Sequence, residues 1–187
     1  MLSQPATRPA RSTLFVWHAA EEMGLVGSRW FVEHTTVPRD SIVAYLNVDM
    51  AGRGGVNDIE GGGPRYVQLI GTRRISTELG DWVEEVNREL GSRFDFDYSY
   101  DANGHPERLY CRSDQASYAR YNIPVADFGT GLHADYHQLT DEPQYIDYQK
   151  LEGVARLMGG VLARVGNAPA RPRIDHPVMD PNAPCVQ

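Results

Sequence analysis

Two continuous apolar runs constrain the fold of this 187-residue chain more than any other feature. Residues 13–17 and 42–48 are mostly apolar, which is typical of strands buried on both faces of a sheet. Apolar residues at helical spacing follow the first run, over residues 24–34. Strands that alternate with helices in this way predict an α/β fold built on a mostly parallel sheet.

The remainder of the chain continues this alternation. The pattern predicts strands at 66–70, 94–98 and 124–128, and helices at 76–90, 113–121 and 148–165. Ser76 or Thr77 and Asp147 can cap the first and last of these helices. We therefore expect a three-layer α/β sandwich with a mixed, mostly parallel sheet. Its expected divisions are a polar lead-in (1–12), the domain itself (13–166) and a proline-rich tail (167–187) that wanders over the surface.

Composition excludes several classes of protein. The net charge of −7 argues against a nucleic-acid binder, which normally carries a basic stripe. No apolar run approaches the roughly 20 residues that a membrane-spanning helix needs. Residues 1–12 lack the apolar stretch of a signal peptide, so the compartment stays unassigned. The two cysteines, Cys111 and Cys185, are too few for a disulfide framework; two free thiols are favoured, with a long-range bond as the alternative.

Acidic residues follow both apolar runs directly. Glu21 and Glu22 stand where the first run turns into a helix, and Asp49 ends the second run. Each has a structural explanation, since carboxylates favour helix N-termini and cap turns. The pair Glu84-Glu85, by contrast, lies in mid-helix, where a solvated face explains it. Because ligands bind outside the carboxyl ends of strands in such sheets, the acids at strand ends are candidates for a site.

A third element follows the last predicted strand. The loop 131–137 contains His133 and His137, and it brings one or two imidazoles to the same edge of the sheet. Carboxylates with histidine and no cysteine suit a hydrolytic zinc site, where Glu21 and Glu22 could serve as general base and ligand. A helical metal pair of His133 and His137 is a weaker alternative, because no glutamate follows His133.

Several segments together resemble the family-28 metallopeptidases, the co-catalytic zinc aminopeptidases related to glutamate carboxypeptidase and the transferrin receptor. Residues 15–28 (FVWHAAEEMGLVGS) and 46–54 (LNVDMAGRG) match two of the family's segments. Ser113-Asp114, Ile123-Pro124 and residues 130–137 (TGLHADYH) match its later stretch. The order and spacing agree from about residue 12 to residue 166.

The resemblance implies a role for each matching residue. Glu21 corresponds to the general base, and Tyr136 to the tyrosine that hydrogen-bonds the carbonyl oxygen as it becomes an oxyanion. Glu22 and His137 correspond to ligands of one zinc ion, and Asp49 to a ligand of a second. The implied reaction is metal-assisted hydrolysis of an N-terminal peptide bond, with a peptide or amino-acyl compound as substrate.

One departure from the family matters for activity. The family places a histidine and a metal-bridging aspartate upstream of the Glu-Glu segment, whereas the 20 residues before Glu21 contain His18 and no aspartate. Because three protein ligands are the usual minimum for catalytic zinc, we expect these 187 residues to bind zinc weakly and to be inactive alone, a partial domain incomplete at its N-terminal side. The run 13–17 would then lack neighbouring strands and promote association.

Two other functions stay open at this stage. A non-catalytic binding module, as in the transferrin receptor, has the same fold, but it need not retain Glu21, Glu22, Asp49, Tyr136 and His137. A single-zinc acyltransferase similar to glutaminyl cyclase also shares the fold, but the residues 135–137 (DYH) and 47–50 (NVDM) resemble the peptidases more. For a longer parent protein, a secreted or periplasmic location is one option.

Overall fold

The computed structural model describes residues 8–91 and 93–187, so residues 1–7 of the expected lead-in lie outside the described part. Within that part, four strands form one mixed sheet in the order β1-β4-β2-β3: β1 (Tyr45–Val48), β2 (Tyr66–Ile70), β3 (Asp95–Asp97) and β4 (Val125–Gly129). The pairs β1–β4 and β2–β3 are parallel, whereas β2 and β4 are antiparallel. The predicted mixed α/β sheet is confirmed.

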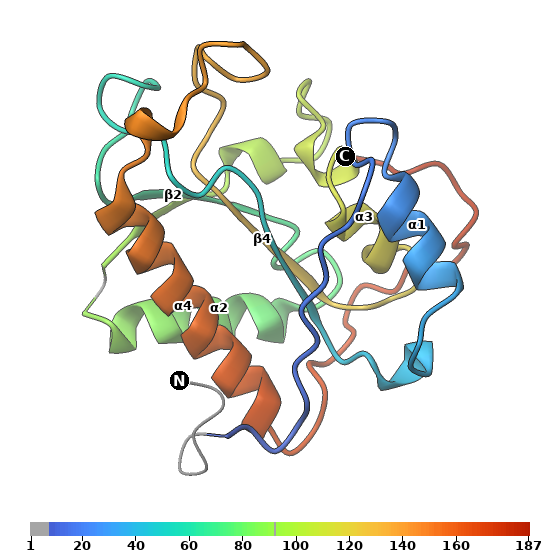
Figure 1. Ribbon diagram of the computed structural model, residues 1–187. Helices are drawn as coiled ribbons and strands as arrows, with labels where there is room; N and C mark the ends of the chain where they lie inside the picture. Colours follow the sequence, from blue (N-terminus) through green and yellow to red (C-terminus); the bar gives the residue numbers. More distant parts are fainter. Residues whose placement is uncertain (1–7, 92) are drawn as a thin grey trace.

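Helices cover both faces of the sheet (Figure 1). They are α1 (Val26–Glu33), α2 (Thr77–Glu89), α3 (Gln115–Ala119) and α4 (Tyr148–Asn167), with short 3₁₀ turns at Arg39–Ser41, Ser99–Asp101, Leu109–Cys111 and Pro143–Tyr145. One core cluster joins the sheet to α2 and α4 through residues such as Phe128, Leu79 and Leu157. A second cluster, with Val125 and Tyr118, lies on the side of α1 and α3. Alternation along β4 thus supplies both faces, as a three-layer sandwich requires.

The long helices begin at the residues that the sequence indicates. Ser76 caps α2 by accepting a hydrogen bond from the backbone N–H of Leu79 at 3.2 Å. Asp147 caps α4 through bonds from the N–H groups of Gln149 and Lys150, both at 3.0 Å. Such caps satisfy N–H groups that have no partner inside the helix. No helix in the described part is long and apolar enough to span a bilayer.

The predicted strand at 13–17 is not formed. This segment is drawn as a plain tube in Figure 1, and among the described residues its backbone makes no backbone hydrogen bond. The expected strand at 42–48 is shorter than predicted, and β1 begins only at Tyr45. An apolar run becomes a strand only where a neighbour pairs with its N–H and C=O groups, and the described residues offer segment 13–17 no such neighbour.

The unpaired segment leaves large apolar side chains exposed, and we expect it to promote self-association. Phe15 and Trp17 are 61% and 87% exposed. Replacing both by serine is expected to shift the chain toward the monomer in sedimentation velocity, because less apolar surface is then exposed to other molecules. Leu139→Ser with Met179→Ser is the control, since both side chains are exposed singly on other loops. A wild-type chain that is already monomeric at high concentration contradicts this prediction.

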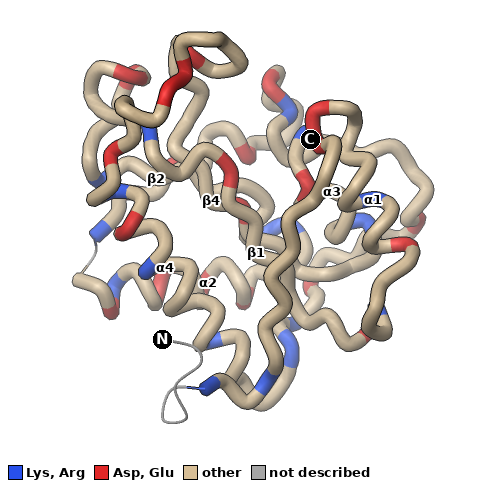
Figure 2. The backbone as a smooth tube through the Cα atoms, in the orientation of Figure 1, with Lys and Arg blue, Asp and Glu red and all other residues tan. Residues whose placement is uncertain are grey.

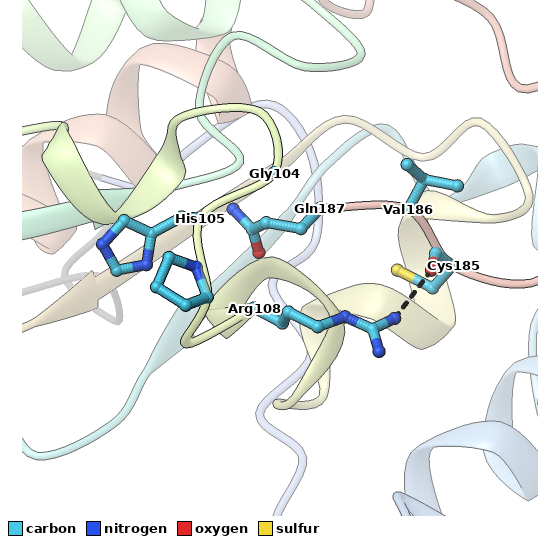
Figure 3. A pocket seen from close by; sticks show the side chains of 7 residues that line it. Gly104, His105, Arg108, Cys185, Val186 and Gln187 are labelled. Carbon is cyan, nitrogen blue, oxygen red and sulfur yellow. Dashed lines mark hydrogen bonds between the residues drawn. The ribbon is translucent and has the colours of Figure 1, made fainter.

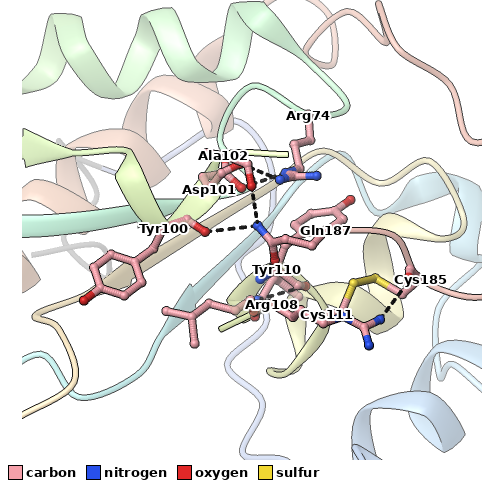
Figure 4. Close-up of a disulfide and its surroundings, with 11 residues drawn as sticks. Arg74, Tyr100, Asp101, Ala102, Arg108, Tyr110, Cys111, Cys185 and Gln187 are labelled. Carbon is pink, nitrogen blue, oxygen red and sulfur yellow. Dashed lines mark hydrogen bonds and ion pairs between the residues drawn. A yellow bond between two sulfur atoms is a disulfide. The ribbon is translucent and has the colours of Figure 1, made fainter. Parts of the chain in front are cut away.

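The C-terminal tail also differs from the expectation. Cys185 forms a disulfide with Cys111, so the two cysteines are not free thiols. The side chain of Gln187, which is only 6% exposed, accepts a hydrogen bond from the backbone of Tyr110 at 2.9 Å and donates one to the carbonyl of Tyr100 at 3.0 Å (Figure 4). The disulfide and the hydrogen bonds of Gln187 therefore hold the end of the tail against the 3₁₀ turns Ser99–Asp101 and Leu109–Cys111.

A shallow hollow of about 330 Å³ lies beside this end of the tail (Figure 3). Its lining includes His105, Arg108 and Val186 and contains no carboxylate side chain. Arg108 donates a hydrogen bond to the carbonyl of Cys185 at 3.2 Å, which ties the two sides of the hollow together. It shares no lining residue with the cavity described below.

Candidate active site

The turn before α1 presents Glu21 and Glu22. The carbonyl of Glu21 accepts hydrogen bonds from the N–H groups of Gly24 at 3.0 Å and Leu25 at 2.8 Å, so the chain reverses directly after the two acids. Helix α1 then packs closely on the incoming chain: a side chain at Gly27 would place its Cβ 2.4 Å from the carbonyl oxygen of Ala19. A glycine is therefore required there, and it holds the acidic turn against α1.

Asp49 follows the last residue of β1, and a polar network surrounds it. Its carboxylate accepts a hydrogen bond from the hydroxyl of Ser113 at 3.2 Å. Within β1, the amide of Asn47 donates to Ser113 Oγ at 3.1 Å and to Asp127 Oδ1 at 3.0 Å. Asn47 and Asp127 are direct partners in the β1–β4 register, which explains why the two buried side chains meet. The network fixes the carboxylate of Asp49 at the end of the sheet.

The loop after β4 brings Tyr136 and His137 to the same place. His137 Nε2 lies 2.6 Å from Glu22 Oε1, although the two residues are far apart in sequence. The ring of Tyr136 stacks on that of His137 with 3.8 Å between centroids. Arg112 donates a hydrogen bond to the hydroxyl of Tyr136 at 3.3 Å. The side chains of His137, Tyr136 and Glu22 are therefore in contact with one another through His137.

All five predicted site residues line one cavity of about 460 Å³. Its wall also includes residues that sequence reasoning did not select: Asn47, Gln68, Arg112, Ser113, Asp114, Asp127, Leu132 and Asp141. Figure 2 shows acidic segments on the loops beyond β1 and β4 and on the turn before α1. The cavity therefore lies where the carboxyl ends of strands place ligands in sheets of this kind.

The gathered acids change one another's protonation. Burial, and then the charges of Glu22, Asp49 and Asp114, raise the pKa of Glu21 to about 7. Burial also raises the pKa of Asp49, and the hydrogen bond from Ser113 opposes this effect. A carboxylate with a pKa near neutral is suited to accept and return a proton at physiological pH.

Left-handed backbone conformations cluster at the same site. Ala20, Met50 and His137 have φ angles of 56°, 55° and 60°. The first two adjoin Glu21 and Asp49, and the third is itself a site residue. The hydroxyl of Thr130 donates a hydrogen bond to the carbonyl of Met50 and helps to hold that conformation. Non-glycine residues in this region cost on the order of 1 kcal/mol each, and such strain is common at functional sites.

His133 does not join the cavity wall. It is buried, and its Nε2 lies 3.8 Å from Asp141 Oδ2, while His137 contacts Glu22. Residues 131–137 form no helix, so the alternative of a helical His133–His137 metal pair is wrong. The two histidines point to different partners because the loop turns between them.

Asp127 also lines the cavity but is not among the predicted site residues. An acid inside an apolar strand is the sequence feature that could have indicated it. A charged residue inside a buried strand is unusual unless it is paired. Here, burial and then the charge of Asp49 raise the pKa of Asp127 to about 7, against the stabilising hydrogen bond from Asn47. Asp127 lies in the middle of β4 rather than at its end, so a rule based on strand ends does not select it.

Replacing Asp127 by asparagine is expected to flatten the pH dependence of stability in the metal-free chain. The unfolded chain ionises Asp127 near its ordinary pKa of 3.8, whereas the folded chain holds the proton until about pH 7. The wild-type free energy of unfolding therefore falls as pH rises from about 4 to 7. At pH 8 the variant is expected to be more stable by up to about 4 kcal/mol, measured by urea unfolding. The exposed Asp40→Asn is the control; equal slopes in the Asp127 variant and wild type would contradict the assignment.

The donors at the cavity suit zinc in kind but not in number. Glu22 and His137 are oxygen and nitrogen ligands of the type that zinc takes, and they are already in contact. Within residues 8–91 and 93–187, however, no three His, Cys, Asp or Glu side chains are grouped closely enough to hold one metal ion. Catalytic zinc usually has three protein ligands. The described residues therefore do not form a complete zinc site.

Comparison with solved structures shows the same fold in bacterial aminopeptidases. The LapA aminopeptidase of Legionella pneumophila is 23% identical with a TM-score of 0.63, over 84% of this chain and 42% of that chain. The aminopeptidase of Aneurinibacillus sp. strain AM-1 is 20% identical with a TM-score of 0.59, over 86% and 35%. BSAP, a zinc aminopeptidase from Bacillus subtilis, is 18% identical with a TM-score of 0.60, over 82% and 36%. This chain thus spans less than half the length of these structures.

The family model for peptidase family M28 matches residues 1–162, which include both the acidic turn before α1 and the loop of His137. That match covers most of the chain, and it agrees with the family that the sequence segments resemble. The chain belongs to peptidase family M28.

Proposed function

We propose that these residues contribute the proton acceptor and part of the metal-binding set of a zinc-dependent aminopeptidase-type enzyme. The observation that carries the proposal is the contact of 2.6 Å between Glu22 and His137, with Glu21 and Asp49 on the wall of the same cavity. Membership of family M28 supports the reaction class, which is hydrolysis of a peptide bond. Hydrolysis at the N-terminal bond is supported by the aminopeptidases of the same fold.

The side chains divide the chemistry as follows. Glu21, with its raised pKa, accepts a proton from the attacking water and returns it to the leaving amine. Tyr136 donates a hydrogen bond to the carbonyl oxygen as negative charge develops on it. Glu22, His137 and Asp49 would hold the metal, which would lower the pKa of the attacking water when bound. Because the described residues do not group three ligands around one ion, we expect the 187-residue chain alone to be inactive.

Zinc titration of the purified chain tests this proposal. We expect weak binding in isothermal titration calorimetry, lost in His137→Ala because half of the ligand pair is removed. The control is His34→Ala, since His34 is exposed at the C-terminal end of α1 and its ring Nδ1 bonds to the carbonyl of Trp30 rather than to an acid. Binding that survives His137→Ala would overturn the ligand assignment. Zinc-dependent release of p-nitroaniline from an amino-acyl anilide by the chain alone would overturn its inactivity.

A further inference from the structure

One buried arginine connects the loops that carry the candidate site. Arg53 follows β1, and its side chain is only 9% exposed. Its guanidinium contacts three carboxylates: Asp58 at 3.1 Å, Asp135 at 3.0 Å and Asp141 at 2.9 Å. Its backbone N–H donates to the hydroxyl of Thr130 at 3.1 Å, just after β4. The same residue thus ties the chain after β1 to the chain after β4.

The three carboxylates come from two loops, one after β1 and one after β4. Asp58 lies in the glycine-rich loop 52–63, Asp135 directly precedes Tyr136, and Asp141 lines the cavity. Three acids close together repel one another unless a cation lies between them. Removing a single partner from a buried ionic cluster leaves uncompensated charge, which is strongly unfavourable. Arg53 therefore offsets the repulsion between these acids where the loop 133–141 packs against the glycine-rich loop.

The glycine-rich loop is itself anchored from its other side. Lys150, buried in the first turn of α4, donates hydrogen bonds to the carbonyls of Gly54 and Gly63, both at 3.0 Å. At Gly54 the φ angle is +82° and a Cβ would lie 2.0 Å from the carbonyl oxygen of Thr130, so only glycine fits. The backbone around Arg53 is thus hydrogen-bonded on both sides. The ion pair of Arg53 with Asp135 can therefore fix the position of Tyr136 and His137, which follow Asp135 in the chain.

We propose that Arg53 is a positioning residue, which holds Tyr136 and His137 over the cavity through its ion pair with Asp135. The proposal rests on the proposed function only for the roles of Tyr136 and His137; the positioning itself is a property of the metal-free chain. The planar fork of arginine matches several carboxylates at once, which a lysine ammonium cannot do with the same geometry. Arg53→Lys is therefore not a conservative change here.

Fluorine NMR of the chain labelled with fluorotyrosine tests this directly. Tyr136→Phe assigns the Tyr136 resonance among those of the ten tyrosines. In Arg53→Met this resonance is expected to move toward the position of free fluorotyrosine, because the stack of Tyr136 on His137 loosens. Arg53→Lys should give an intermediate shift, and Asp135→Asn a shift in the same direction. The Tyr145 resonance is left out of the comparison, since Arg53 lies 5.3 Å from that ring.

Arg164→Met is the matched control. Arg164 also joins two acids, Glu85 and Glu89, but it does so between α4 and α2. It should lower the urea midpoint without moving the Tyr136 resonance. The proposal is overturned if Arg53→Met destabilises the chain and leaves that resonance in place. If Arg53→Met does not fold, an unmoved resonance in Asp135→Asn overturns it equally. Failure of the wild-type chain to bind zinc would count against the proposed function and not against this positioning.

Discussion

Glu21→Gln is expected to lower kcat by about 10²–10⁴-fold in any aminopeptidase that contains these residues, with little change in bound zinc. The substitution removes the proposed proton acceptor and leaves the proposed ligands Glu22, His137 and Asp49 in place. The pKa of Glu21, raised to about 7 by burial and by the neighbouring acids, suits a group that takes up and returns a proton near neutral pH. The measurement is steady-state hydrolysis of an amino-acyl anilide together with metal analysis of the purified enzyme.

Two further variants separate this role from general effects of charge. Glu60→Gln changes an exposed acid on the glycine-rich loop and should leave kcat unchanged. Glu22→Gln should instead lower the zinc content, because Glu22 is the partner of His137. A Glu21→Gln enzyme that keeps most of its kcat would exclude Glu21 as the proton acceptor.

Removing the Cys111–Cys185 disulfide is expected to lower the free energy of unfolding by about 4 kcal/mol, the loss of loop-closure entropy for a bond across so long a loop. The two cysteines are separated by 74 residues. Replacing both by serine, or adding a reductant to the wild-type chain, should reduce the urea midpoint to the same extent. The tail would also lose the constraint that keeps Gln187 bonded to Tyr110.

Reductant applied to the double serine variant supplies the control, since it should have no further effect there. Because Cys111 directly precedes Arg112 and Ser113, the loss of the bond should also disturb the cavity wall. Titration of the non-reduced chain with a thiol reagent provides an independent check. Two reactive thiols, or equal midpoints with and without reductant, would contradict the disulfide.

Much of the fold follows from local sequence. The capped helices α2 and α4 and the strands β2 and β4 lie close to where apolar periodicity and the caps Ser76 and Asp147 indicate. These elements have strong local signals, because spacing at 3.6 or 2 residues and a capping side chain depend on near neighbours. Asp49 was also recognisable, since it follows β1 and a parallel sheet collects such residues at one edge, whereas Glu21 and Glu22 follow no strand among the described residues.

What local sequence could not determine depends on pairing across space. The run 13–17 has the composition of a buried strand, but a strand needs a partner, and none of the described residues supplies one. Nothing in the spacing of Cys111 and Cys185 shows that the tail returns to the turn at Leu109–Cys111. The family resemblance selects His137 over His133, but only the turn of the loop places His133 beside Asp141 and His137 against Glu22.

The sequence by itself therefore determined the family, the main helices and strands, and the identity of five candidate site residues. The tertiary structure decided which groups those residues face: Asp127 against Asn47 in the β1–β4 register, Ser113 on Asp49, and Arg53 among three carboxylates. The physical reason is the difference in sequence range between the interactions involved. Backbone propensity and capping act over a few residues, whereas burial of charge and hydrogen-bond partnership depend on segments that meet only when the chain has folded.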